Sequence, residues 1–166
     1  MNSRARVVSA IVAATAAASL ALFAGGGANA GGRPFNLQLS GANEFGPTGV
    51  PINPHGDADH APIALTLNPG QGEVCWTIGE LTLTAGDSLP VVAHIHEAPA
   101  GISGPIVVDL FGMPDTPAAP TSYPTDTNCV DAPRSVILEI MQDPSEYYVN
   151  LHSAEHPAGV MRAQLG

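Results

Sequence analysis

Hydrophobic and polar residues alternate in several short stretches of the chain. Four stretches place apolar side chains on one face: Phe35, Leu37 and Leu39; Ile63, Leu65 and Leu67; Val74, Trp76 and Ile78; Ile106, Val108 and Leu110. A period of two is typical of β-strands with one buried face. The sequence NPGQG at 68–72 separates the second stretch from the third and predicts a hairpin, because Pro and Gly suit tight turns.

The C-terminal part of the chain adds one helix and two strands to this pattern. Apolar residues at helical spacing follow Pro133 and stop before Asp143 and Pro144. The predicted elements are a helix at 134–142, strands at 147–152 and 160–165, a loop at 153–159 and an exposed loop at 111–128. Short strands joined by turns predict an all-β fold, an antiparallel sandwich or barrel with one short helix.

The N-terminus has the features of an export signal. Arg4 and Arg6 precede an apolar run at 7–24, and small residues ending at Ala30 follow it. This order is typical of a secretory signal peptide, whereas an alanine-rich run followed by three glycines is a poor membrane span. We therefore expect a signal peptide at 1–30, one domain at 31–166, and no membrane association after cleavage.

The charge of the chain excludes some partners. All 15 acidic residues follow the predicted signal peptide, while the chain has five arginines and no lysine, for a net charge of −10. Such a surface disfavours nucleic acids and anionic lipids. The charge itself suggests a soluble exported protein, with cations or basic molecules as the alternative partners.

The two cysteines, Cys75 and Cys129, predict a disulfide because exported chains meet oxidising conditions. A disulfide needs Cα atoms roughly 5–6 Å apart. Closing a loop of this length stabilises the fold by about 4 kcal/mol.

Candidate chemistry centres on the sequence AHIHEAPAGISGP at 93–105. In a strand, His94 and His96 share one face, and Asn150 and His152 share a face of a later strand. If the two strands are neighbours, three imidazoles can converge on copper or zinc. The alternative is that these side chains hydrogen-bond the loops that follow them.

Further residues qualify this site. Glu97 or Asp109 could accept a hydrogen bond from a liganding histidine. Gly101 or Gly104 is predicted to adopt a positive φ in the loop.

A second cluster, His55, Asp57, Asp59 and His60, is interpreted as a solvated turn, because the other oxygen ligands of a calcium loop are missing. Serine nucleophiles lack a G-x-S-x-G setting, so we expect no enzymatic activity.

Three blocks of the sequence resemble the CHRD (chordin-type) domain of secreted bacterial proteins: LSGANE at 39–44, AHIHEAPAGISGPIVVDL at 93–110 and YYVNLHSAEHPAGVMRAQL at 147–165. The resemblance implies an immunoglobulin-like β-barrel in an exported protein. The matching positions are Ser40, Gly41, Glu44, His94, His96, Gly101, Gly104, Pro105, Asn150, His152, Pro157, Gly159, Arg162 and Gln164. Val160 and Ala163 depart from the usual glutamate and glycine, so Arg162 needs another partner, and Glu44 or Glu155 is predicted.

Two functions follow as expectations. The first is a secreted module that binds an extracellular protein or a cell-envelope component through the family motif residues His94, His96, Gly101, Gly104, Asn150, His152 and Arg162. The alternative is a copper or zinc protein that uses His94, His96 and His152, because H-x-H on a Greek-key barrel is similar to copper-zinc superoxide dismutases.

Overall fold

The computed structural model describes residues 32–52 and 58–166. The predicted signal peptide and the residues His55 and Asp57 lie outside these ranges. The strands are β1 (Arg33–Ser40), β2 (His60–Asn68), β3 (Glu73–Ile78), β4 (Val92–Glu97), β5 (Ile106–Phe111), β6 (Asn128–Asp131), β7 (Tyr147–His152) and β8 (Met161–Gln164). The helices are η1 (Gly41–Asn43), α1 (Arg134–Gln142) and η2 (Pro144–Glu146), of which η1 and η2 are 3-10 turns.

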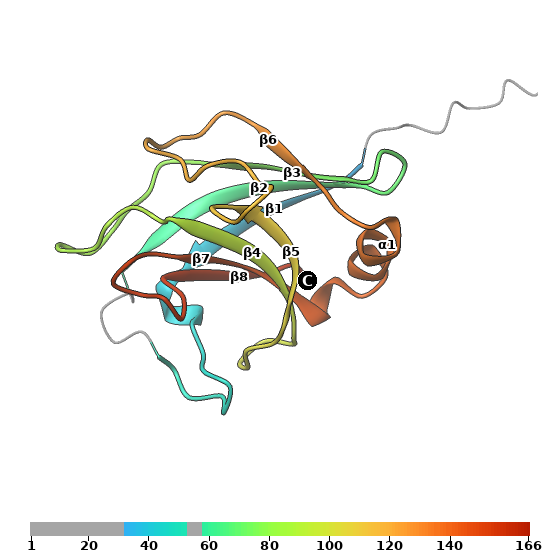
Figure 1. Cartoon of the computed structure of the whole chain (residues 1–166). Helices are drawn as coiled ribbons and strands as arrows, with labels where there is room; N and C mark the ends of the chain where they lie inside the picture. Colours follow the sequence, from blue (N-terminus) through green and yellow to red (C-terminus); the bar gives the residue numbers. More distant parts are fainter. Residues whose placement is uncertain (1–31, 53–57) are drawn as a thin grey trace, which may run out of the picture.

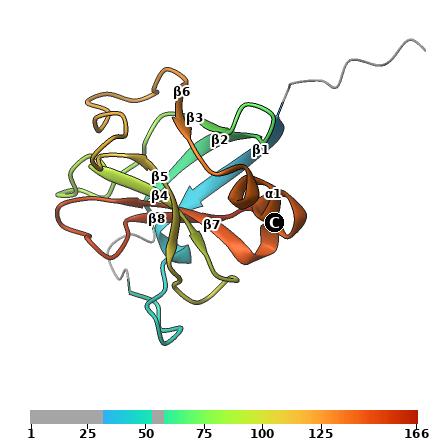
Figure 2. The same ribbon diagram turned by 45° about the vertical axis from the view of Figure 1, so that its right-hand side comes forward.

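The eight strands form one antiparallel sheet that curves into a nearly closed barrel (Figure 1). Their order is β5-β4-β7-β8-β1-β2-β3-β6, so the neighbours β4 and β7, β8 and β1, and β3 and β6 are distant in sequence. The two outermost strands, β5 and β6, approach each other, and the turned view shows the curvature (Figure 2). The predicted all-β fold with one short helix is confirmed.

One hydrophobic core fills the barrel. Period two turns the predicted apolar positions of each strand inward, and nearly all of them are buried. The rings of Trp76 and Phe111 lie 5.1 Å apart between their centroids. Ile137 and Ile140 of α1 are fully buried, so the helix packs its apolar side against the barrel. No helix within 32–52 or 58–166 is long and apolar enough to cross a membrane.

The segment 111–128 differs from the predicted exposed loop at both ends. Phe111 is fully buried as the last residue of β5, because its ring packs on Trp76. Asn128 begins β6, whose four residues pair with β3. The hairpin at 68–72 is confirmed: Asn68 Oδ1 accepts hydrogen bonds from the backbone of Gly70 and Gln71.

The predicted disulfide between Cys75 and Cys129 is present and joins β3 to β6. Its Cα atoms lie 4.0 Å apart, which is closer than the predicted 5–6 Å. The two cysteines are direct partners in the antiparallel ladder, where opposite residues approach most closely. The disulfide therefore fastens the short outermost strand β6 to the rest of the sheet.

Candidate functional site

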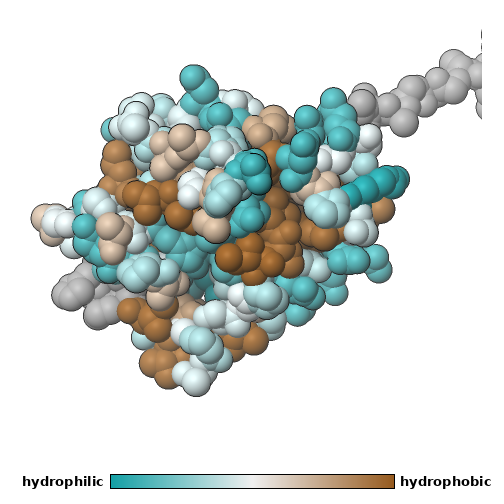
Figure 3. All heavy atoms as spheres, viewed as in Figure 1, coloured by the Kyte–Doolittle hydropathy of each residue, from teal (hydrophilic) through white to brown (hydrophobic). Residues whose placement is uncertain are grey.

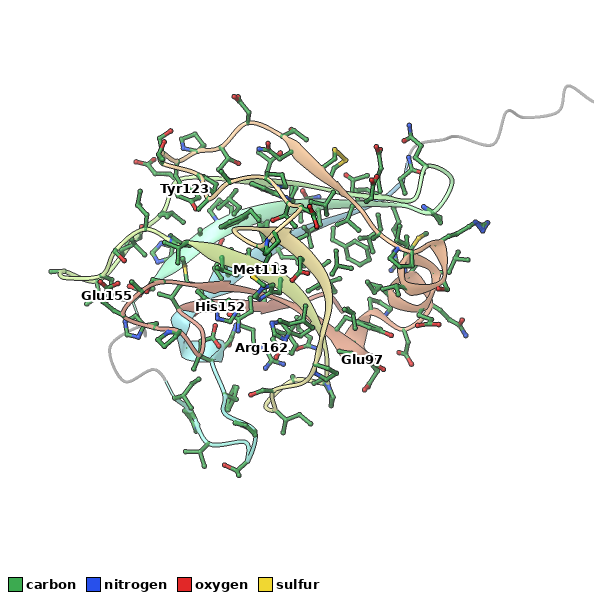
Figure 4. The ribbon with its side chains drawn as sticks, in the orientation of Figure 1. Glu97, Met113, Tyr123, His152, Glu155 and Arg162 are labelled. Carbon is green, nitrogen blue, oxygen red and sulfur yellow. A yellow bond between two sulfur atoms is a disulfide. The ribbon has the colours of Figure 1, made fainter. Side chains whose placement is uncertain are left out.

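Polar side chains form a buried layer on the outer face of β4, β7 and β8. Across the three strands, His94 lies opposite Asn150, which lies opposite Arg162. Two residues along, His96 lies opposite Tyr148, which lies opposite Gln164. All of these side chains except that of Gln164 are at least nine-tenths buried. We call them, together with His152 and Glu44, the polar layer. Figure 4 shows His152 and Arg162 beside these strands.

The structure brings the three predicted histidines together. One ring nitrogen from each of His94, His96 and His152 lies within 4.8 Å of the others. His94 Nδ1 and His152 Nε2 lie 3.2 Å apart. Asp109, which is opposite His94 in the β4–β5 ladder, has its Oδ1 atom 3.4 Å from His94 Nε2. Of the two predicted acceptors, Asp109 lies at the cluster and Glu97 is exposed.

Burial disfavours the charged form of all three histidines. Burial, followed by repulsion from His96, lowers the pKa of His94 to about 4. Burial and then the neighbouring His94 and His96 lower the pKa of His152 to about 4, against the opposing effect of the Pro157 carbonyl. The pKa of His96 is also lowered, mainly by burial. Neutral imidazole is the form that binds a metal ion.

The polar layer also holds the loop at 98–105. His96 Nδ1 donates to the Gly104 carbonyl at 2.9 Å, and the Gly104 N–H donates to the Tyr148 hydroxyl at 3.2 Å. Arg162 donates to the carbonyls of Ile102 at 2.6 Å and Pro99 at 3.0 Å. Each bond satisfies a backbone group that a loop would otherwise leave to water.

Arg162 differs from the prediction that it pairs with Glu44 or Glu155. Besides the two loop carbonyls, its guanidinium donates to Gln164 Oε1 at 3.0 Å. The guanidinium also lies over the Tyr148 ring. Glu155 instead accepts hydrogen bonds from Ser88. Backbone carbonyls therefore take the place of the carboxylate expected from the family pattern.

Glu44 lies at the other end of the layer. Its Oε2 atom accepts a hydrogen bond from Asn150 Nδ2 at 3.4 Å. Burial raises the pKa of Glu44 to about 8, while the nearby Arg162 charge and the Asn150 bond act in the opposite direction. A Cβ on Gly159 would lie 2.4 Å from Glu44 Oε2, so only glycine fits beside this carboxyl group. The loop at 153–159 is thus packed against the layer, and His152 Nδ1 contacts the Pro157 carbonyl at 3.2 Å.

The two loop glycines act differently. Gly101 has φ +89 with open space around it, which confirms the predicted positive φ. Gly104 has no positive φ, but a Cβ there would lie 1.8 Å from the Glu97 carbonyl oxygen. Gly104 therefore allows the backbone of the loop to approach β4.

The other candidates do not join the layer. Asp59 is fully buried and accepts hydrogen bonds from the backbone and hydroxyl of Thr84, while His60 Nδ1 contacts the Ala58 carbonyl. His156 Nε2 pairs with Asp87 at 3.0 Å. Sequence reasoning missed Tyr148, although it shares a strand face with Asn150 and His152.

The comparisons with known proteins identify the family alone. A model of the CHRD domain matches residues 35–165. The comparisons with curated proteins and with solved structures give no match. The matched range contains all members of the polar layer and both loops that it holds.

Proposed function

Because the chain belongs to the CHRD domain family, we propose that it is an exported module that binds an extracellular protein or a cell-envelope component without catalysing a reaction. The family model covers 35–165, and CHRD domains are typically extracellular. The signal-like N-terminus and the disulfide support export. The acidic charge favours a neutral or basic partner over nucleic acid.

The observation that carries this proposal is the use of the family motif to fix loops. His96, Tyr148 and Arg162 hold four backbone groups of the loop at 98–105. A loop fixed before binding loses little conformational entropy when a partner arrives. The motif thus supports a preformed recognition surface.

We define the recognition surface as the loops at 44–52 and 98–105. Ser103 Oγ donates to the Phe45 carbonyl at 2.6 Å, which joins the two loops. Between them lies a pocket of about 130 Å³ that Arg162 and Gln164 line from below. Val50 and Ile102 are 58% and 40% exposed, so each loop presents an apolar side chain to solvent.

Position-dependent crosslinking tests the proposal. A photoreactive amino acid replaces Val50 or Ile102 in the full chain, expressed in the cells that make this protein. Leu138 is the matched control, because it is 41% exposed but lies on α1. We expect discrete adducts from positions 50 and 102, outside the cytoplasm, that excess unlabelled protein suppresses.

Two outcomes would contradict the proposal, and one further measurement identifies the class of partner. Equal labelling from position 138 would mean that the loops are not a recognition surface. Retention of the whole chain in the cytoplasm with an uncleaved N-terminus would exclude export. Protease digestion of the adducts separates a protein partner from an envelope polymer.

A further inference from the structure

Hydrogen-bond donors and acceptors do not match within the cluster of His94, His96 and His152. The Nδ1 atoms of His96 and His152 face the carbonyls of Gly104 and Pro157. A carbonyl can only accept, so both Nδ1 atoms carry the proton. The Nε2 atom of each ring therefore carries a lone pair. The Nε2 atom of His96 is buried and has no hydrogen-bond partner within the described ranges.

His94 cannot satisfy both of its neighbours in a neutral form. Its Nδ1 atom faces the lone pair of His152 Nε2 at 3.2 Å, and its Nε2 atom faces Asp109 Oδ1 at 3.4 Å. With the proton on Nδ1, the Nε2 lone pair faces a carboxylate oxygen. With the proton on Nε2, the two imidazole lone pairs face each other. A neutral ring can therefore donate toward His152 or toward Asp109, but not toward both.

A bound cation removes this conflict. With the proton of His94 on Nε2, lone pairs remain on His94 Nδ1, His96 Nε2 and His152 Nε2, and one ring nitrogen of each histidine lies within 4.8 Å of the others. The opposite nitrogens of His96 and His152 then donate to the Gly104 and Pro157 carbonyls, and that of His94 lies 3.4 Å from Asp109 Oδ1 without a hydrogen bond in this geometry. Metal-binding histidines typically have such acceptors, which orient the ring and fix its tautomer. The 3.2 Å separation is close to that of two nitrogens each about 2 Å from one metal ion.

The open side of the cluster indicates which metal. A groove of about 380 Å³ borders His94 and His152, and its other walls are Val91, Val92, Ile106, Met113, Ser153 and Pro157. Figure 3 shows hydrophobic surface over β5 in this region, and Figure 4 labels Met113 near His152. The lining contains a thioether but neither a carboxylate nor a thiol. Thioether donors select copper(I), whereas zinc prefers thiolate, imidazole or carboxylate.

We propose that His94, His96 and His152 bind one copper(I) ion and that Met113 supplies a fourth, thioether ligand from the groove. The site shares His96 with the contacts that hold the loop at 98–105, but its test measures metal affinity instead of partner binding. Failure of this proposal therefore leaves the proposed function standing, and the reverse also holds.

Metal competition tests the site. Chelator-treated protein is titrated with copper(I) against a chromophoric copper(I) chelator, and separately with zinc. We expect the wild type to bind one equivalent of copper(I). In a His94→Gln, His152→Ala double variant the copper(I) affinity should fall by at least about 100-fold, because even the loss of a residue that only hydrogen-bonds to a ligand can lower metal affinity by that much. His156→Ala is the matched control, because His156 pairs with Asp87 outside the cluster.

Met113→Leu separates copper(I) from zinc. It preserves an apolar side chain of similar size and removes only the sulfur. We expect a loss of about tenfold in copper(I) affinity, unchanged zinc affinity, and loss of copper–sulfur scattering in X-ray absorption. Circular dichroism of every metal-free variant checks folding, and His94→Gln alone replaces the double variant if that does not fold. Equal copper(I) affinity in the wild type and the histidine variant would overturn the site. Equal affinity in Met113→Leu would overturn the copper(I) assignment.

Discussion

The guanidinium carbon of Arg162 lies 3.4 Å from the centroid of the Tyr148 ring. The same ring stacks on His96, with centroids 4.8 Å apart and an angle of 5° between the planes. One tyrosine thus connects a β8 cation to a β4 imidazole. His96 and Arg162 also hydrogen-bond to the loop at 98–105. The Tyr148 ring therefore helps to position both of the side chains that hold this loop.

Replacing Arg162 by lysine tests this connection. Lysine keeps the charge but cannot reach the Ile102 and Pro99 carbonyls together or stack in the same way on Tyr148. We expect the free energy of unfolding to fall by about 2–3 kcal/mol and amide exchange at 98–105 to accelerate. Arg134→Lys, at the exposed start of α1, should change stability by less than about 0.5 kcal/mol. Unchanged exchange in Arg162→Lys would show that the loop is held by other contacts.

Alanine at the two loop glycines should destabilise to different degrees. Gly101→Ala adds a methyl group in open space at φ +89, so the expected loss is about 1 kcal/mol. Gly104→Ala forces the loop away from the Glu97 carbonyl, so a loss of about 2–3 kcal/mol is expected. Gly86→Ala, at φ +108 in open space, should match Gly101→Ala in thermal unfolding. A larger loss of stability in Gly101→Ala than in Gly104→Ala would contradict the close approach of Gly104 to the Glu97 carbonyl.

Removing the disulfide should destabilise the domain substantially. The two cysteines are 54 residues apart, and closing such a loop contributes about 4 kcal/mol. We expect a Cys75→Ala, Cys129→Ala double variant to lose about that much stability in chemical denaturation. The wild type should release no reactive thiol when unfolded without a reductant, and two thiols would show that the bond does not form.

Glu44 should make stability depend on pH in a direction that is unusual for a carboxyl group. Burial raises its pKa in the folded state to about 8 from the ordinary value of 4.5, so the folded state binds the proton more tightly. The stability is therefore fully present below pH 4.5 and is lost as pH rises to 8. Compared with Glu44→Gln, the wild type should lose about 4–5 kcal/mol across this window.

The Glu44 comparison isolates one group because both proteins contain the same histidines. Glu139→Gln on the exposed side of α1 removes one charge without burial, and it controls for net charge. Parallel stability curves for the wild type and Glu44→Gln between pH 4.5 and 8 would contradict a protonated, buried Glu44.

Local pattern predicted most of the fold. Alternation located the strand faces, and the helix at 134–142 was predicted with the bounds that the structure has. β6 was missed because its sequence NCVD has only one apolar residue, Val130, flanked by a cysteine and an acid. Its strand conformation depends on pairing with β3, a long-range contact without a local signal.

The site was predictable only in part, for a similar reason. Period two placed His94 with His96, but the adjacency and register of β4 and β7 come from the topology of the sheet. The partners of Arg162 were predicted wrongly because every residue has a backbone carbonyl, so the sequence does not indicate which one accepts. Met113 gave no signal because loop residues have no period to place their side chains.

The outer face of the sheet is completed by contacts between the two ends of the domain. Asn43 Nδ2 contacts the Arg162 carbonyl over a separation of 119 residues, and Glu44 meets Asn150 over 106. A ribosome that is still making β7 and β8 therefore holds a chain that cannot yet assemble this face. Contacts between residues so far apart in the sequence also form slowly, because a long loop must close before they are made. The topology thus makes the outer face the part of the domain that is completed last, after β7 and β8 have been synthesised.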